Sequence, residues 1–128
     1  MQNGTETEAR VKQELFTEIQ NLESYYQVIS GYLAGTEYDV TEIRANLQIF
    51  KASLNKATAY LLTLYNLKGQ RIKIPWESLF TNLDNALATM ELASSAKLRM
   101  AVQLALNMSE PKIEQVMSYL VSLKEVLK

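Results

Sequence analysis

The chain contains no cysteine and no histidine. Without cysteine it has no disulfide bond, no thiolate nucleophile, no iron–sulfur cluster and no cysteine-ligated zinc. Without histidine it lacks the commonest general base near neutral pH and the commonest ligand of transition metals. Di-iron carboxylate bundles use Glu-x-x-His pairs, so that class is excluded too. Carboxylates are the only remaining acid–base or metal-binding groups, and we expect no catalytic site, no metal and no cofactor.

Glycine, proline and long apolar runs are also scarce. The 128 residues include four glycines and two prolines, and no glycine-rich motif that would cradle a phosphate is present. The longest nearly apolar run, residues 57–67, is shorter than the roughly 20 residues that span a bilayer. The first ten residues are polar and acidic, unlike a secretory signal. We therefore expect a cytoplasmic protein that makes no contact with a membrane.

Apolar residues recur along the chain at alternating spacings of three and four. This spacing keeps side chains on one side of an α-helix. The three clearest rows are Leu15, Ile19, Leu22, Tyr26, Ile29 and Leu33; Ile43, Leu47, Phe50, Leu54, Ala57, Leu61 and Leu64; and Ile113, Val116, Leu120, Leu123 and Leu127. Rows of this kind pack against one another at about 20° in helical bundles. The sequence therefore predicts an all-α fold.

Short connections separate the predicted helices. Residues 35–39 and 69–74 each contain a glycine that suits the end of a helix. Because connections this short force neighbouring helices to run antiparallel, we predict an up-down four-helix bundle. A single domain covers residues 1–128, with residues 1–5 forming a frayed tail.

The third predicted helix is the least regular. Pro75 suits a first turn, where its missing N–H costs nothing. Beyond Ser94-Ser95, apolar residues occupy nearly every side of the helix as far as Met108. We interpret this stretch as one helix from Pro75 to Met108 with a kink near the serine pair; the alternative is a break into two helices there. Ser109-Glu110-Pro111 then predicts the start of a short fourth helix.

Charge is unevenly distributed, although the net charge is only −1. Residues 1–42 carry eight acids and two bases, whereas residues 43–76 carry six bases and no acid. In one interpretation, opposite charges on the first two helices flank their seam and fix their pairing. In the alternative, the bases form a stripe that binds nucleic-acid phosphates. The residues of that predicted basic stripe are Arg44, Lys51, Lys56, Tyr60, Lys68, Arg71 and Lys73.

The apolar segment 98–108 suggests a protein interface. It holds more hydrophobic surface than a short fourth helix can cover, which favours contact with a partner chain or a second copy. The alternative is burial within the bundle. The candidate interface residues are Leu98, Val102, Leu106, Met108 and Tyr25. The sequence thus favours a non-enzymatic protein–protein interaction or assembly protein. The alternative is a nucleic-acid-contacting module or a small subunit of a nucleoprotein complex.

Overall fold

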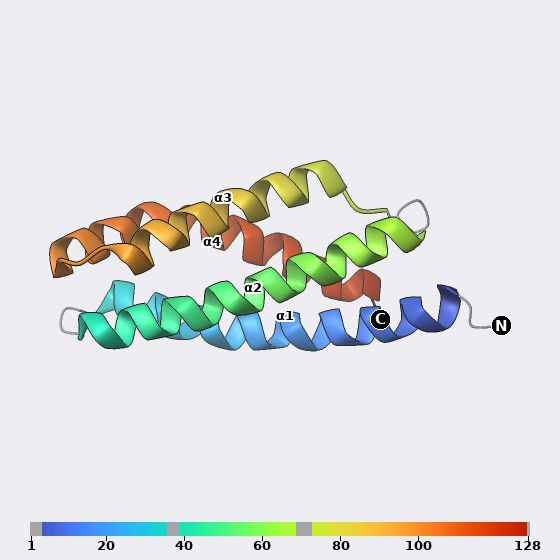
Figure 1. Cartoon of the computed structure of the whole chain (residues 1–128), viewed down its shortest axis with the longest axis horizontal. Helices are drawn as coiled ribbons and strands as arrows, with labels where there is room; N and C mark the ends of the chain where they lie inside the picture. Colours follow the sequence, from blue (N-terminus) through green and yellow to red (C-terminus); the bar gives the residue numbers. More distant parts are fainter. Residues whose placement is uncertain (1–3, 36–38, 69–72, 128) are drawn as a thin grey trace.

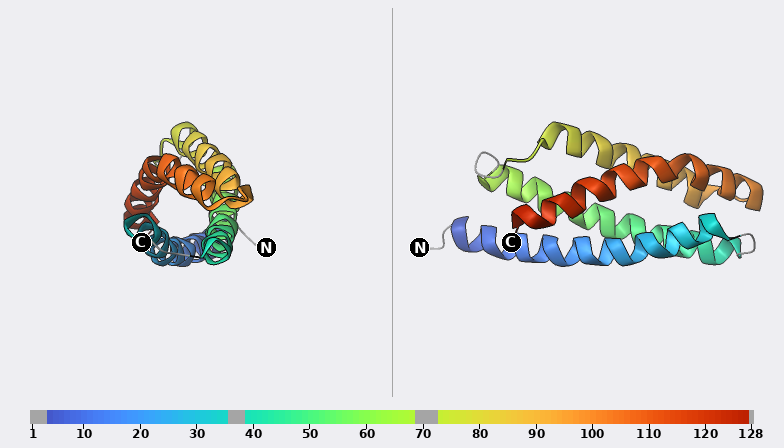
Figure 2. Two further views of the ribbon diagram at one scale, coloured as in Figure 1. Left: turned by 90° about the vertical axis from the view of Figure 1, so that its left-hand side faces the viewer. Right: turned by 180° about the vertical axis from the view of Figure 1, so that it is seen from behind.

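The computed structural model describes residues 4–35, 39–68 and 73–127, and it places four α-helices in them (Figure 1). These are α1 Gly4–Ala34, α2 Val40–Lys68, α3 Trp76–Ser95 and α4 Arg99–Leu127. Seen end-on, the helices surround a common axis in the order α1, α2, α3, α4, and each packs on its two neighbours (Figure 2). Consecutive helices run in opposite directions, so the predicted antiparallel four-helix bundle is confirmed. α1 begins at Gly4, and the frayed tail over residues 1–5 stays a prediction.

The core fills the interior of this ring, and the spacing of the apolar rows explains why. Every residue of the predicted row in α2 is buried, and so is every residue of the row that ends α4. In α1 the row is less regular, because Tyr26 and Leu33 are only partly buried while Tyr32 is buried. Burying a Leu, Ile or Phe side chain contributes about 1.5–3 kcal/mol, so these rows dominate the stability of the bundle.

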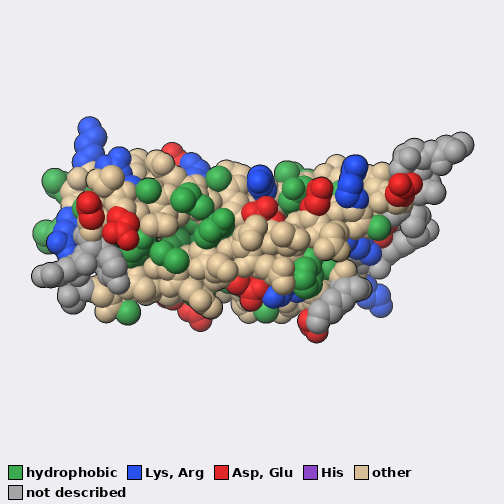
Figure 3. Space-filling view, turned by 90° about the horizontal axis from the view of Figure 1, so that it is seen from below, with side chains coloured by type: hydrophobic (Ala, Val, Ile, Leu, Met, Phe, Trp, Pro, Cys, Tyr) green, Lys and Arg blue, Asp and Glu red, His purple; other side chains and the backbone are tan. Residues whose placement is uncertain are grey.

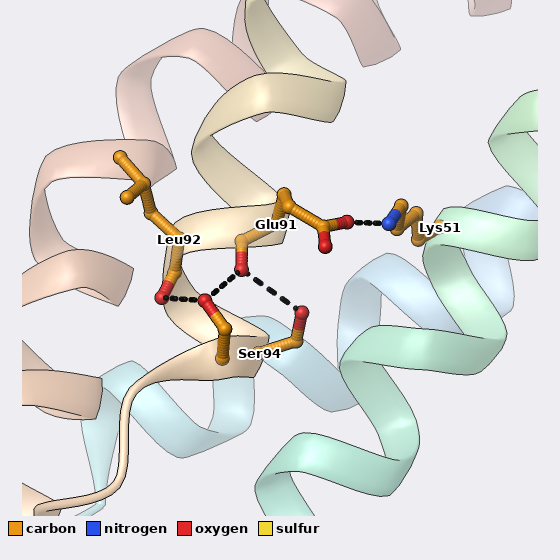
Figure 4. A network of polar contacts seen from close by, with 5 residues as sticks. Lys51, Glu91, Leu92 and Ser94 are labelled. Atoms are coloured by element: carbon orange, nitrogen blue, oxygen red, sulfur yellow. Dashed lines mark hydrogen bonds and ion pairs between the residues drawn. The ribbon is translucent and has the colours of Figure 1, made fainter.

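The predicted third helix ends after the serine pair, so the single kinked helix from Pro75 to Met108 is wrong. Ser94 Oγ donates to the Glu91 carbonyl at 3.2 Å and Ser95 Oγ donates to it at 2.7 Å (Figure 4). Ala96 then leaves the helix with φ −67° and ψ 140°. From α2, Arg44 Nε donates to the Ser94 carbonyl at 3.0 Å. This bond satisfies one of the carbonyls that the end of a helix leaves without an internal donor, and it stabilises the break.

The fourth helix is longer than predicted and begins earlier. It starts at Arg99, so Pro111 lies inside α4 and not at its first turn. Proline has no N–H to offer the carbonyl of Asn107, but Asn107 lies on the exposed part of the helix, where water can bond that carbonyl. The buried row of α4 continues across the proline, from Leu106 to Ile113. Packing of this row outweighs the local cost of the proline.

Polar contacts join each pair of neighbouring helices. Ser53 Oγ donates to Glu18 and Asn46 Nδ2 to Tyr32 between α1 and α2; Lys51 pairs with Glu91 between α2 and α3; Ser109 Oγ donates to the Thr89 carbonyl between α3 and α4; Lys124 pairs with Glu23 between α4 and α1. The Ser53–Glu18 contact is buried. The partly exposed ion pairs Lys51–Glu91 and Lys124–Glu23 add little stability each, on the order of 1 kcal/mol or less. They do select the rotation of each helix about its axis.

Candidate interaction surface

Two members of the predicted basic stripe are engaged inside the bundle. Arg44 binds the Ser94 carbonyl. Lys51 forms an ion pair with Glu91 (Figure 4). Both partners belong to α3. Lys51 therefore meets an acid of α3, and not one of acidic α1 as the first of the two interpretations of the charge pattern expects.

The other members of the stripe lie in different surroundings. Lys56 and Lys73 are exposed, whereas Tyr60 is half-buried against the core. The side chain of Lys68 and the whole of Arg71 lie outside the described residues. Among the residues that the structure describes, two lysines of the stripe thus remain open to solvent. Binding of nucleic acid stays a prediction.

The N-terminal half of α4 carries two separate apolar rows. Val102 and Leu106 are each 1% exposed and belong to the core, so they do not form the outward interface that the sequence predicts. Met100, Leu104 and Met108 are 85%, 62% and 65% exposed. Their spacing of four places them on one side of the helix, away from the buried row.

Two leucines extend this outward row at the α3–α4 turn. Leu98, in the turn itself, is 71% exposed, and Leu92, in the last turns of α3, is 67% exposed. Tyr25 lies on α1, where it is half-buried against the core. We define the apolar face as Leu92, Leu98, Met100, Leu104 and Met108.

Three residues of the apolar face, Leu92, Met100 and Leu104, are absent from the interface predicted from the sequence. For Met100 and Leu104 the sequence nevertheless contains a signal. The row Met100–Leu104–Met108 lies on a different side of the helix from Val102 and Leu106. The sequence shows that the two rows lie on different sides of a helix, but not which side faces the core. That assignment requires knowing that α4 begins at Arg99.

The outward side of α4 remains uncharged beyond the apolar face. It continues at spacings of three and four through exposed residues that are small or polar and neutral. These are Pro111, Gln115, Ser118 and Ser122. An open hollow of 490 Å³ lies over them, with Glu114 and Tyr119 also lining it. One half of this side therefore bears large apolar side chains, and the other half bears a hollow.

A second uncharged row lies beside α4 on α3. It consists of Ser78, Asn82, Asn85, Thr89 and Leu92, at spacings of four and three. Ser78 and Asn82 line a hollow together with Gln115 and Tyr119 of α4. The row therefore follows α4 along its length and ends in the apolar face at Leu92.

The α1 side of the bundle has a different character. Figure 3, which views the molecule from that side, shows charged side chains of both signs spread along its length, with hydrophobic ones gathered toward the end where α1 finishes and α2 begins. Where α1 meets α4, Tyr26 Oη donates to Glu110 Oε1 at 3.3 Å. Burial raises the pKa of the Tyr26 hydroxyl; the carboxylates of Glu110 and Glu114 raise it further, and a bond to Ser30 opposes them.

Other kinds of site find no support in the described residues. Within 4–35, 39–68 and 73–127, no three carboxylates lie close enough together to hold a metal ion. Over the same ranges, no helix combines the length and the apolarity needed to cross a bilayer. Comparison of the chain with protein-family models, with curated proteins and with solved structures finds no match. Its function must therefore be inferred from its own surface.

Proposed function

We propose that this chain is a non-enzymatic interaction or assembly protein that docks to another protein through the apolar face. The observation that carries the proposal is the exposed row Met100, Leu104 and Met108, of which no side chain is less than 62% exposed. Single exposed apolar residues are normal on a protein surface, but contiguous groups of large ones mark interaction sites.

The composition of the face suits a protein partner. Methionine side chains are flexible and polarisable, and they adapt to irregular apolar surfaces. Bringing one of these mostly exposed side chains out of water contributes about 1–2 kcal/mol, so losing one weakens a complex about tenfold. Toward the C-terminal half of α4 the face continues into residues such as Gln115 and Ser118, which carry no charge for a phosphate to pair with.

A retention experiment tests the proposal. The tagged full chain is exposed to a lysate of its source organism, and bound proteins are compared for wild type, Leu104→Glu and the control Leu62→Glu. Leu62 lies on α2, outside the apolar face, and is 46% exposed, so the control adds the same charge to a different surface. We expect wild type and the control to retain the same partner, either another protein or a further copy of the chain, and Leu104→Glu to lose it.

The folding of the variants is checked first. Both leucines are exposed, so circular dichroism and thermal unfolding should change little, by less than about 0.5 kcal/mol. Equal retention by wild type and Leu104→Glu would contradict the proposal. So would a wild-type chain that is monomeric and retains no protein at all.

A further inference from the structure

We propose that the protein bound at the apolar face is a second copy of this chain, packed antiparallel along α4 about a twofold axis near Pro111. The inference rests on the proposed function and names its partner. It follows from three features of the outward side of α4: its shape, its end charges and its size.

The shape of this side is complementary to itself. Large side chains occupy its N-terminal half, and the hollow of 490 Å³ occupies its C-terminal half. A twofold axis places the same patch on both copies, so a patch that pairs with itself must be self-complementary. With the axis at Pro111, residues equally far from it in opposite directions face each other. Leu104 then faces Ser118 of the other copy, Met100 faces Ser122, and Met108 faces Glu114 at the edge of the hollow.

A parallel arrangement lacks this fit. It would set Leu104 against Leu104 and leave the two hollows facing each other, with nothing to fill them. Unfilled space at an interface forfeits the dispersion contacts that close packing provides. The distribution of large and small residues therefore favours the antiparallel arrangement.

The charges at the two ends of α4 agree with the same arrangement. Lys97 and Arg99 lie at its start. In its last turns Glu125 is exposed, and the neighbouring base Lys124 is paired with Glu23 of α1. Antiparallel copies bring the bases of one chain to the acid of the other, and they also oppose the two helix dipoles. Parallel copies would place like charges together at both ends.

The surface is also large enough for a dimer. The 29 residues of α4 span about 44 Å at 1.5 Å per residue, and the neighbouring row on α3 widens the strip to about 20 Å. Such a strip presents on the order of 800 Å², which is the usual contribution of each partner to a specific interface.

The first test is the mass of the full chain in solution over a range of concentrations, measured by sedimentation equilibrium. We expect a reversible dimer of twice the 14.5 kDa chain mass. Leu104→Glu should raise the dimer dissociation constant at least about tenfold, and so should Ser118→Trp, which fills the hollow. The control Leu62→Glu should leave that constant unchanged. If either variant unfolds, Leu104→Ala and Ser118→Leu replace them, with smaller shifts in the same direction.

Cross-linking then tests the direction of packing. The chain has no cysteine, so a single introduced cysteine reports one position. Two cysteines join only when their Cα atoms lie within about 7 Å. We expect a mixture of Leu104→Cys and Ser118→Cys chains to form a mixed disulfide dimer. Neither chain alone should cross-link efficiently.

Each contrary result overturns the inference in a distinguishable way. Efficient cross-linking of Leu104→Cys with itself would place Leu104 of the two copies together, which contradicts an axis at Pro111. A dimer that is insensitive to Leu104→Glu and Ser118→Trp would place the contact elsewhere. A wild-type chain that remains monomeric up to about 500 µM would exclude a second copy at useful affinity. In that last outcome the proposed function survives if the lysate experiment still shows a partner that depends on Leu104.

Discussion

Replacing Pro111 by alanine tests whether α4 is one continuous helix. In the structure Pro111 lies at the thirteenth position of α4, where its ring crowds the carbonyl of Asn107 and it cannot donate a hydrogen bond. The sequence pattern instead predicts that Pro111 begins a helix. The expected effect of replacing Pro111 by alanine therefore depends on whether Pro111 lies inside a helix or at its first turn.

The size of the effect follows from the position of the residue. In the interior of a helix, proline is about 3 kcal/mol less favourable than alanine. Proline also restricts the unfolded chain, which offsets about 0.4–1 kcal/mol of that difference. Because α4 has already adapted to the ring, we expect Pro111→Ala to raise the free energy of unfolding by about 1–3 kcal/mol. At the first turn of a helix, the same change would be neutral or slightly destabilising.

The assay is urea unfolding followed by far-ultraviolet circular dichroism. Pro111 lies near the proposed twofold axis, so both chains should carry Leu104→Glu, which keeps self-association from contributing to stability. Equal m-values for the two chains would show that the denatured state is unchanged. A change smaller than about 0.5 kcal/mol, or a loss of stability, would refute an α4 that continues through Pro111.

Three further predictions concern the bundle and its charges. Arg44→Ala removes the donor to the Ser94 carbonyl and should lower the free energy of unfolding by about 1–2 kcal/mol in the same assay, with Arg44→Lys restoring little of it; unchanged stability would contradict its role at the end of α3. The raised pKa of Tyr26 means that the folded state holds the phenolic proton more tightly than the unfolded state, so this contribution is present below about pH 10 and is lost as the pH rises through the folded pKa. Unfolding above that pH should therefore depend less steeply on pH in Tyr26→Phe, and equal slopes would contradict this. Fluorescence anisotropy with single- and double-stranded DNA and RNA at about 50 mM salt should show no binding, and saturable binding that Lys56→Glu weakens would favour the nucleic-acid alternative.

The sequence predicts the helices best where stability depends on one regular row. All seven residues assigned to the core of α2 are buried. Their three-and-four spacing places them on a single side of the helix, so one orientation of the helix buries them all. In α1 the same spacing also included Tyr26, which instead lies at the edge of the core and bonds to Glu110. A tyrosine can lie either in the core or at its edge with the hydroxyl bonded, so the spacing of apolar residues alone does not distinguish the two locations.

The break after Ser94-Ser95 depends on contacts that the local sequence does not contain. A serine or threonine hydroxyl can bond a carbonyl of its own helix without ending it, as Thr58 does inside α2. At Ser94 the helix ends where Arg44, fifty residues earlier in the chain, binds the carbonyl. The start of α4 was misplaced for a related reason: Pro111 has the local features of a helix start, and only the packing of the whole row overrides them.

The exposure of the candidate interface residues was partly predictable. Leu98 and Met108, both predicted from the apolar segment, are exposed, whereas Val102 and Leu106 face the core. When nearly every position of a segment is apolar, composition shows that it is enclosed but not which side the rest of the chain covers. Knowing the residue at which α4 begins shows which of its sides faces the core.

Pulsed electron resonance distances between spin labels most directly test antiparallel pairing of α4. Single cysteines for the label replace Lys112, one residue from the proposed axis, and Glu125, fourteen residues from it, in otherwise wild-type chains. At 1.5 Å per residue, the axis predicts labels within about 15 Å of each other at position 112 and about 42 Å apart at position 125. Short distances at both positions would contradict the antiparallel dimer, and the absence of any distance between chains would contradict pairing through α4 altogether.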